Sequence, residues 1–213
     1  MVEIDTLRRH DLVYIKPEAW MELLAGHDLG PLDKDVLSWA AFERPTVLRR
    51  RICSDPDDAV PVGLPLPPCL GRKRLALACP PAALMRAAAP LLLSEALSAA
   101  PNGWRQAIDA LLAEDTPWRC FGSLAWQHVT GLPYLTNASD LDLLVYCSCE
   151  AQATQATRVL SDIAAHAPMR IDAELISSTG AAVQWREWSS GVLELLVKSH
   201  QGPSVIPREA LFG

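Results

Sequence analysis

The apolar and polar positions of the chain form two kinds of pattern. In the first 79 residues, short apolar runs are ended by proline, glycine or charged residues, which is typical of short strands and turns. From residue 117 onward, apolar runs of strand length alternate with helical periodicity, as in the amphipathic stretch 150–166. Residues 80–116 are rich in alanine and leucine, which favours helix. The pattern predicts an α+β protein with two modules and a helical connection between them.

The predicted elements fall into these three segments. Segment 1–79, a small mixed module, is expected to contain a helix at 18–25, an ambiguous apolar run at 36–42, an extended Pro-rich stretch at 60–68, and strands at 12–15, 46–52 and 74–78. Segment 80–116 is expected to contain helices at 82–89, 91–99 and 104–113. Segment 117–213 is expected to contain helices at 123–130 and 150–166, and strands at 118–121, 140–146, 169–176, 181–186 and 192–197.

Two short motifs in the last segment carry the candidate chemistry. Gly122 and Ser123 follow a predicted strand and open a predicted helix, so their backbone N–H groups could hold an anion. Asp140 and Asp142 lie two residues apart in a predicted strand and should therefore share one face. Two carboxylates forced together favour a cation between them. A divalent metal beside a phosphate cradle is typical of phosphoryl or nucleotidyl transfer.

A second acidic strand follows at Asp172 and Glu174. If this strand lies beside the first, it adds a third carboxylate, and three carboxylates can hold two divalent ions. Asp172 is the better candidate ligand, while Glu174 is equally well explained as a solvated strand residue. Arg170 shares their face and could orient a carboxylate.

Composition and charge exclude several other functions. The net charge of −6 argues against broad binding of nucleic acid. No apolar run approaches the length of a membrane span, and the acidic start does not resemble a secretory signal, so we expect a cytoplasmic protein whose six cysteines stay reduced. The histidine and cysteine spacings do not match a zinc site, and no G-x-S-x-G motif surrounds Ser123.

The Gly-Ser step, the Asp-x-Asp strand and the later acidic strand together resemble the DNA polymerase β-like nucleotidyltransferase superfamily. This resemblance covers roughly the last 95 residues and implies a nucleotidyltransferase-fold domain with a mixed sheet flanked by helices. It implies that Gly122 and Ser123 contact a triphosphate. It also implies that Asp140, Asp142 and Asp172 bind two Mg²⁺ ions and are catalytic, with Arg170 beside the last.

A closer resemblance extends over nearly the whole chain. The chain is similar to the phosphoribosyl-dephospho-CoA transferases of malonate decarboxylase, which are its holo-acyl-carrier-protein synthases. The motifs that carry this resemblance are residues 9–14 (RHDLVY), 44–51 (RPTVLRRR), 61–67 (PVGLPLP), 122–127 (GSLAWQ), 130–135 (TGLPYL), 139–144 (SDLDLL) and 185–188 (WREW). Thr46 is a departure, because family members more often have an apolar residue there.

The family resemblance implies a specific reaction. The phosphoribosyl-dephospho-CoA unit would move from its triphosphate precursor to a serine of the apo acyl-carrier subunit of malonate decarboxylase, and pyrophosphate would leave. The acidic net charge and the lack of a long apolar run separately argue against nucleic acid and membranes as partners. Residues 1–79 would then bind substrate or the partner protein, and segment 117–213 would carry the chemistry.

The arginine clusters have two interpretations. Arg49, Arg50 and Arg51 could hold the triphosphate tail or receive the anionic carrier, because arginine binds phosphate in a bidentate manner. A solvated basic face explains the cluster equally well. The second cluster, at 72–74, is the weaker candidate because Gly71 before it suggests a solvated turn.

Two other functions remain open from the sequence. The same chemistry could serve a different acceptor, such as a small molecule or another protein that receives an ordinary nucleotide. Alternatively, the fold could be a binding module without turnover, which the intact set of aspartates disfavours because clustered charge is costly.

Overall fold

The computed structural model describes residues 2–25, 33–71, 74–199 and 202–213. The chain forms two compact units. The first comprises Met1–Pro90 with Val129–Pro133, and the second comprises Leu91–His128 with Tyr134–Gly213. The boundary at Pro90 falls inside the segment 80–116 that was predicted as a helical connection.

The first unit is built on a five-stranded antiparallel sheet in the order β4-β3-β2-β1-β5. Its strands are β1 (Leu12–Ile15), β2 (Thr46–Leu48), β3 (Val60–Pro65), β4 (Arg74–Cys79) and β5 (Leu84–Ala88). Its α-helices are α1 (Trp20–Leu24) and α2 (Asp33–Ala41), and its short 3-10 turns are Ile4–Thr6, Pro17–Ala19, Pro68–Leu70 and Pro81–Ala83.

The alternation of buried and partly exposed side chains shows which face of this sheet packs into the core. Val60, Val62 and Leu64 of β3 are buried, and the residues between them are partly exposed. Thr46 stands in β2 as a fully buried polar residue. Its hydroxyl donates to the Val13 carbonyl at 2.9 Å. This hydrogen bond satisfies the buried hydroxyl group, so threonine is tolerated where an apolar residue was expected.

One predicted element of this unit is wrong. Residues 82–89 were expected to be helical, but Leu84–Ala88 form β5, which pairs with β1. The stretch lies between Pro80-Pro81 and Pro90 and is too short to be stable as an isolated helix. Pairing with β1 supplies its backbone hydrogen bonds and overrides the helix propensity of its alanines.

The second unit contains a seven-stranded mixed sheet in the order β12-β11-β10-β9-β8-β7-β6. Its strands are β6 (Leu91–Leu92), β7 (Arg119–Phe121), β8 (Leu141–Tyr146), β9 (Ile171–Ile176), β10 (Ala182–Gln184), β11 (Glu194–Ser199) and β12 (Gly202–Pro207). The α-helices are α3 (Leu93–Ala96), α4 (Arg105–Leu112), α5 (Gly122–Thr130), α6 (Glu150–Ala164) and α7 (Trp185–Ser189), and the 3-10 turns are Leu97–Ala99, Asn102–Trp104 and Arg208–Leu211.

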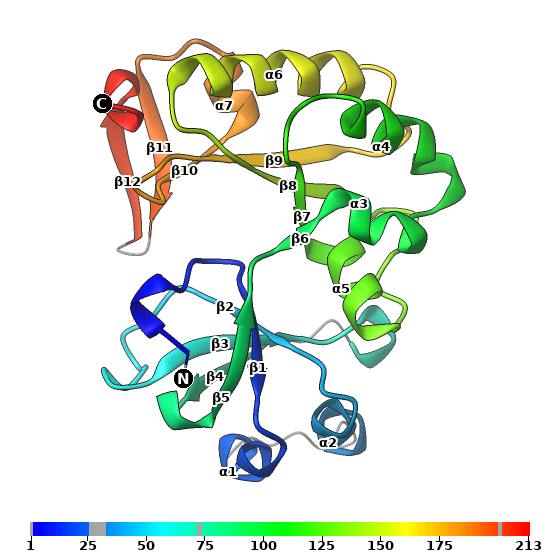
Figure 1. The fold of residues 1–213 in the computed structure, drawn as a ribbon, viewed down its shortest axis with the longest axis vertical. Helices are drawn as coiled ribbons and strands as arrows, with labels where there is room; N and C mark the ends of the chain where they lie inside the picture. The colour runs from blue at the N-terminus through cyan, green and yellow to red at the C-terminus, as the bar shows by residue number, and fades with distance from the viewer. Residues whose placement is uncertain (1, 26–32, 72–73, 200–201) are drawn as a thin grey trace. The chain divides into compact units, whose positions relative to one another are not determined.

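The two faces of this sheet differ in character. The odd-numbered residues of β8 and β9, such as Leu143 and Ala173, pack into one apolar core with residues of α4, α6 and α7. Figure 1 shows α6 and α7 lying along that side of the sheet. The even-numbered residues of both strands, including Asp142 and Asp172, point to the opposite face.

The α+β class predicted from the sequence is confirmed. Of the predicted β-strands, 46–52 ends early at Leu48, and 181–186 gives way after Gln184 to the unpredicted helix α7. Strands β6 and β12 were also not predicted, and β6 takes the first two residues of the helix expected at 91–99. None of the helices in the described residues is apolar over a length that could cross a bilayer.

Candidate active site

The Gly-Ser step and the Asp-x-Asp strand meet at Gly122. Phe121 at the end of β7 pairs with Asp142 of β8, so the chain turns into α5 directly beside the Asp142 carboxylate. Gly122 has φ of 65°, and a Cβ at this position would lie 1.8 Å from Asp142 Oδ2. Only glycine leaves room for this carboxylate and also adopts this backbone conformation without strain.

The strands that carry the two acidic motifs are neighbours. β8 and β9 pair in parallel, with Asp142 directly beside Asp172 in the register. Neighbouring strands lie roughly 4.8 Å apart, so two carboxylates on one face at this register are forced close together. The expected adjacency of these strands is therefore confirmed, although each aspartate's role as a ligand stays a prediction.

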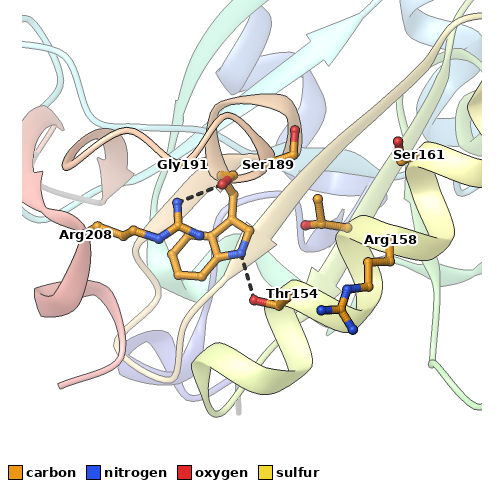
Figure 2. Close-up of a pocket in the computed structure, with 8 residues that line it drawn as sticks. Thr154, Arg158, Ser161, Ser189, Gly191 and Arg208 are labelled. Carbon is orange, nitrogen blue, oxygen red and sulfur yellow. Dashed lines mark hydrogen bonds between the residues drawn. The ribbon is translucent and has the colours of Figure 1, made fainter.

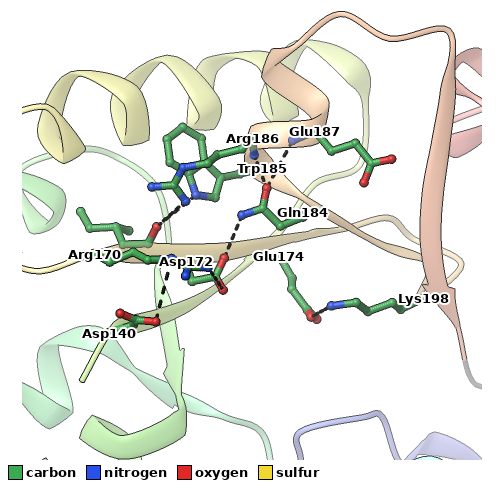
Figure 3. Close-up of polar contacts among 10 residues, drawn as sticks. Asp140, Arg170, Asp172, Glu174, Gln184, Trp185, Arg186, Glu187 and Lys198 are labelled. Carbon is green, nitrogen blue, oxygen red and sulfur yellow. Dashed lines mark hydrogen bonds and ion pairs between the residues drawn. The ribbon is translucent and has the colours of Figure 1, made fainter. Parts of the chain in front are cut away.

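Arg170 lies between two of the carboxylates. Its Nη2 is 3.3 Å from Asp172 Oδ2, and its Nε is 3.9 Å from Asp140 Oδ2 (Figure 3). The arginine side chain is 60% exposed, and both separations are long, so these ion pairs are weak. Arg170 thus supplies positive charge between Asp140 and Asp172 without being fixed there.

Gln184 holds the other oxygen of Asp172. Its Nε2 donates to Asp172 Oδ1 at 2.8 Å. Its Oε1 accepts the backbone N–H groups of Arg186 at 2.5 Å and Glu187 at 3.2 Å, which caps the N-terminus of α7. One amide therefore ties a candidate catalytic carboxylate to the start of a helix, as Figure 3 shows.

The start of α7 also holds the backbone that precedes Asp172. The Ile171 carbonyl accepts from Arg186 Nη1 at 2.9 Å and from Trp185 Nε1 at 3.3 Å. The WREW motif is thus a support for the acidic strand. Sequence reasoning noted this motif but gave it no role, and it missed Gln184, which directly precedes the motif.

Glu174 and Lys198 form an ion pair on the same face. Lys198 Nζ lies 2.9 Å from Glu174 Oε1, and the glutamate is buried. Glu174 lies beside Leu144 in the register, two residues further along the strands than the pair of Asp142 and Asp172. A lysine already occupies this carboxylate, so Asp172 is the stronger candidate for a third ligand.

Comparison with known proteins covers both units. Residues 91–209 match the family model described as phosphoribosyl-dephospho-CoA transferase MdcG C-terminal domain, and residues 8–90 match the model of the MdcG N-terminal domain. The chain belongs to the phosphoribosyl-dephospho-CoA transferase family. The two models meet at residue 90, where the two units of the structure also meet.

Three relatives illustrate the similarity, and each is named phosphoribosyl-dephospho-CoA transferase. The protein from Bradyrhizobium diazoefficiens is 42% identical over 90% of this chain and 86% of its own. The one from Xanthomonas campestris pv. campestris (strain 8004) is 36% identical over 96% of both chains. The one from Pseudomonas putida (strain GB-1) is 34% identical over 87% of this chain and 91% of its own. No solved structure matches the chain.

The transferase has its arginine cluster in the first unit. Arg49 is bound internally: its guanidinium forms a bidentate pair with Asp55 at 2.8 and 2.5 Å and also donates to the Val62 and Leu77 carbonyls. The hydrogen bond from Arg49 holds the pKa of the Asp55 carboxyl below its usual value. These contacts explain Arg49 as a support of the loop that contains Asp55.

The other two arginines of the cluster differ from Arg49. Arg51 donates to the carbonyls of Pro56 and Ala59, the latter at 2.6 Å. The Nε atom of Arg50 is buried and has no hydrogen-bond partner among the described residues. Arg50 therefore differs from Arg49 and Arg51 in having a buried guanidinium N–H without a partner among the described residues. Residues 72 and 73 of the second cluster lie outside the described residues.

The donor set suits magnesium. Asp140, Asp142 and Asp172 offer only carboxylate oxygens, which Mg²⁺ prefers, and the absence of a Cβ at Gly122 lets the Asp142 carboxylate take its present position. In the described part of the chain, no three His, Cys, Asp or Glu side chains are grouped closely enough to hold a metal as they stand. Arg170 occupies the position between Asp140 and Asp172, and its weak contacts allow it to move.

Proposed function

We propose that the chain transfers phosphoribosyl-dephospho-CoA from its triphosphate precursor to a serine of the apo acyl-carrier subunit of malonate decarboxylase, and that pyrophosphate leaves. The choice of the transferred group rests on the family, since the relatives bear the name phosphoribosyl-dephospho-CoA transferase. The observation that carries the chemistry is the contact of Asp142 with Gly122, with Asp172 beside it in the register. We infer a nucleotidyltransferase fold for the second unit from the same arrangement.

The residues have distinct parts in this proposal. Asp140, Asp142 and Asp172 would hold Mg²⁺, which would neutralise charge on the reacting phosphates. The backbone at Gly122 and Ser123 would hold the outer phosphates at the start of α5. Arg170 would follow the phosphate charge after leaving its weak pairs with the aspartates.

The bond changes are those of an in-line substitution. The serine oxygen forms a bond to the α-phosphorus, and the bond from that phosphorus to the pyrophosphate oxygen breaks. Asp172 would accept the serine proton at Oδ2, because Gln184 already occupies Oδ1. The product is a phosphodiester on the carrier.

The experiment is intact-mass spectrometry of the apo carrier subunit with this protein, Mg²⁺ and the triphosphate precursor. We expect the carrier to gain the mass of the prosthetic group. Asp142→Asn keeps the shape of the side chain and should slow this gain by about 10²-fold or more, because several kcal/mol of electrostatic stabilisation are lost. Asp140→Asn should act in the same direction.

Asp162→Asn is the matched control, since Asp162 is an exposed carboxylate on α6 in the same unit. It should leave the rate unchanged. An unmodified carrier in the presence of intact precursor would refute the proposed acceptor. Near-normal turnover of both Asp140→Asn and Asp142→Asn, with folding verified by circular dichroism, would refute the proposed site.

A further inference from the structure

A cavity of about 280 Å³ lies in the second unit, away from the aspartates. It is lined by one side of α6, the end of α7 and Arg208 (Figure 2). Helices α6 and α7 cover the apolar face of the sheet, whereas Asp142 and Asp172 point to the opposite face. The cavity is therefore not part of the candidate active site.

Two arginines give the cavity its charge. The Arg208 guanidinium stacks 3.6 Å over the Trp188 ring and donates to the Trp188 carbonyl at 2.7 Å, so it is held in place. Arg158 is exposed and forms no ion pair or side-chain hydrogen bond within the part of the chain that the structure describes. A fixed guanidinium thus faces the same cavity as one whose donors are available.

The hydroxyl groups of the cavity add further donors. Thr154 Oγ1 accepts from Trp188 Nε1 at 3.4 Å, which leaves the threonine hydrogen available for a ligand. Ser161 lines the cavity with a hydroxyl that makes no hydrogen bond among the described residues. Thr157 and Ser189 already donate to backbone carbonyls.

The carboxylate that pairs with Arg208 does not neutralise this charge. Glu150 Oε1 lies 4.0 Å from Arg208 Nε, and its side chain is 68% exposed. It is not among the residues that line the cavity. Such a long, solvated pair contributes little and leaves the cavity positive.

We propose that this cavity binds a phosphate group of a small molecule. Arginine forks match phosphate oxygens in a bidentate manner, and the free hydroxyls complete a set of donors around them. The volume is just below the range of usual ligand pockets, about 300–1,000 Å³, so it suits a phosphate or diphosphate with a small attached group. A ligand as large as a whole coenzyme would not fit.

The test uses two-dimensional NMR of the full-length protein, with the assigned indole N–H of Trp188 as the local reporter. The titrants are inorganic phosphate, pyrophosphate and AMP, with acetate as the comparison anion, all without added Mg²⁺. We expect a saturable shift of this resonance with at least one of them, and the tightest titrant distinguishes free phosphate from a nucleotide. Arg158→Gln should weaken this binding at least tenfold, since it removes a guanidinium without breaking an internal contact.

Three further variants make the result decisive. Arg105→Gln removes an exposed arginine on α4 and should leave the binding unchanged. Arg158→Lys should bind more weakly than the wild type because it keeps the charge but loses the fork. Asp142→Asn should still shift the Trp188 resonance, because the aspartate lies on the other face of the sheet.

Several outcomes would overturn the proposal. One is the absence of a saturable Trp188 shift at millimolar phosphate, pyrophosphate or AMP. Another is an equal loss in Arg105→Gln and Arg158→Gln, which would indicate a general charge effect. A third is acetate binding as tightly as phosphate, which would point to a carboxylate ligand.

Discussion

At the residue scale, Gly122 and Asp142 constrain each other. The Asp142 carboxylate occupies the space where any other residue at position 122 would place its Cβ. The backbone at Gly122 is also in the left-handed region, which adds a separate demand for glycine. The contact with Asp142 affects the candidate site, whereas the left-handed backbone conformation affects only the turn.

Gly122→Ala should therefore lower transfer to the carrier by about 100-fold, because the carboxylate must move away from its present position. Gly131→Ala is the matched control: Gly131 has φ of 68°, but a Cβ there would meet no atom within 4 Å. Both variants should lose about 1 kcal/mol of stability from backbone strain. The measurements are initial rates by intact mass and thermal melts.

If Gly131→Ala reduced the rate as much as Gly122→Ala, backbone strain would explain both results and the contact with Asp142 would have no special part. The need for glycine at 122 was visible in the sequence only as a common Gly-Ser dipeptide. Its reason became clear once β7 and β8 were paired.

At the element scale, the junction of β10 and α7 supports the acidic strand. Gln184 ends β10, caps α7 and donates to Asp172. Arg186 donates to the carbonyl of the residue that precedes Asp172. The sequence predicted a strand through Arg186, because a helix of five residues is too short to show periodicity. Gln184 could not be identified as part of the site, because its contact depends on β10 pairing with β9.

Gln184→Asn separates the two functions of this side chain. Asparagine is a good N-cap, so α7 should begin as before, but its shorter amide should not reach Asp172. We expect an unchanged melting temperature, a transfer rate lowered by about 10-fold, and a higher Mg²⁺ concentration for half-maximal rate. Rates measured across a Mg²⁺ titration test this.

Gln184→Glu is the companion variant. It keeps the length and the acceptor for the helix cap, but it replaces the donor to Asp172 with an oxygen. Its rate should fall further than that of Gln184→Asn. Full activity at low Mg²⁺ in both variants would exclude a positioning role for Gln184.

At the scale of the whole molecule, the sequence predicted the two acidic strands and the helix between them well, because long periodic stretches are strong signals. It failed at residues 84–88, where the sheet of the first unit recruits a helix-favouring segment as β5. Strand β12 contains Pro203 and Pro207 and was missed for that reason. Proline disfavours strands except at edges, and β12 is an edge strand.

The reactivity of the six cysteine thiols tests whether the cores of both units are packed as described. Cys53, Cys69 and Cys149 are exposed, whereas Cys79, Cys120 and Cys147 are buried. Burial raises the pKa of the buried thiols to about 11, 12 and 11, respectively. Since the thiolate is the reactive form, the native protein should show three fast thiols with an aromatic disulfide reagent and the other three only after unfolding. Six thiols reacting at one rate would contradict these cores.

The parallel register of β8 and β9 also acts against misfolding. A slip of one residue in either strand would turn Asp142 or Asp172 into the apolar core beneath α6. Burying an unpaired carboxylate costs several kcal/mol, a large part of the stability of a typical domain. The aspartates proposed for the reaction thereby raise the free energy of any sheet in which β8 and β9 pair out of register.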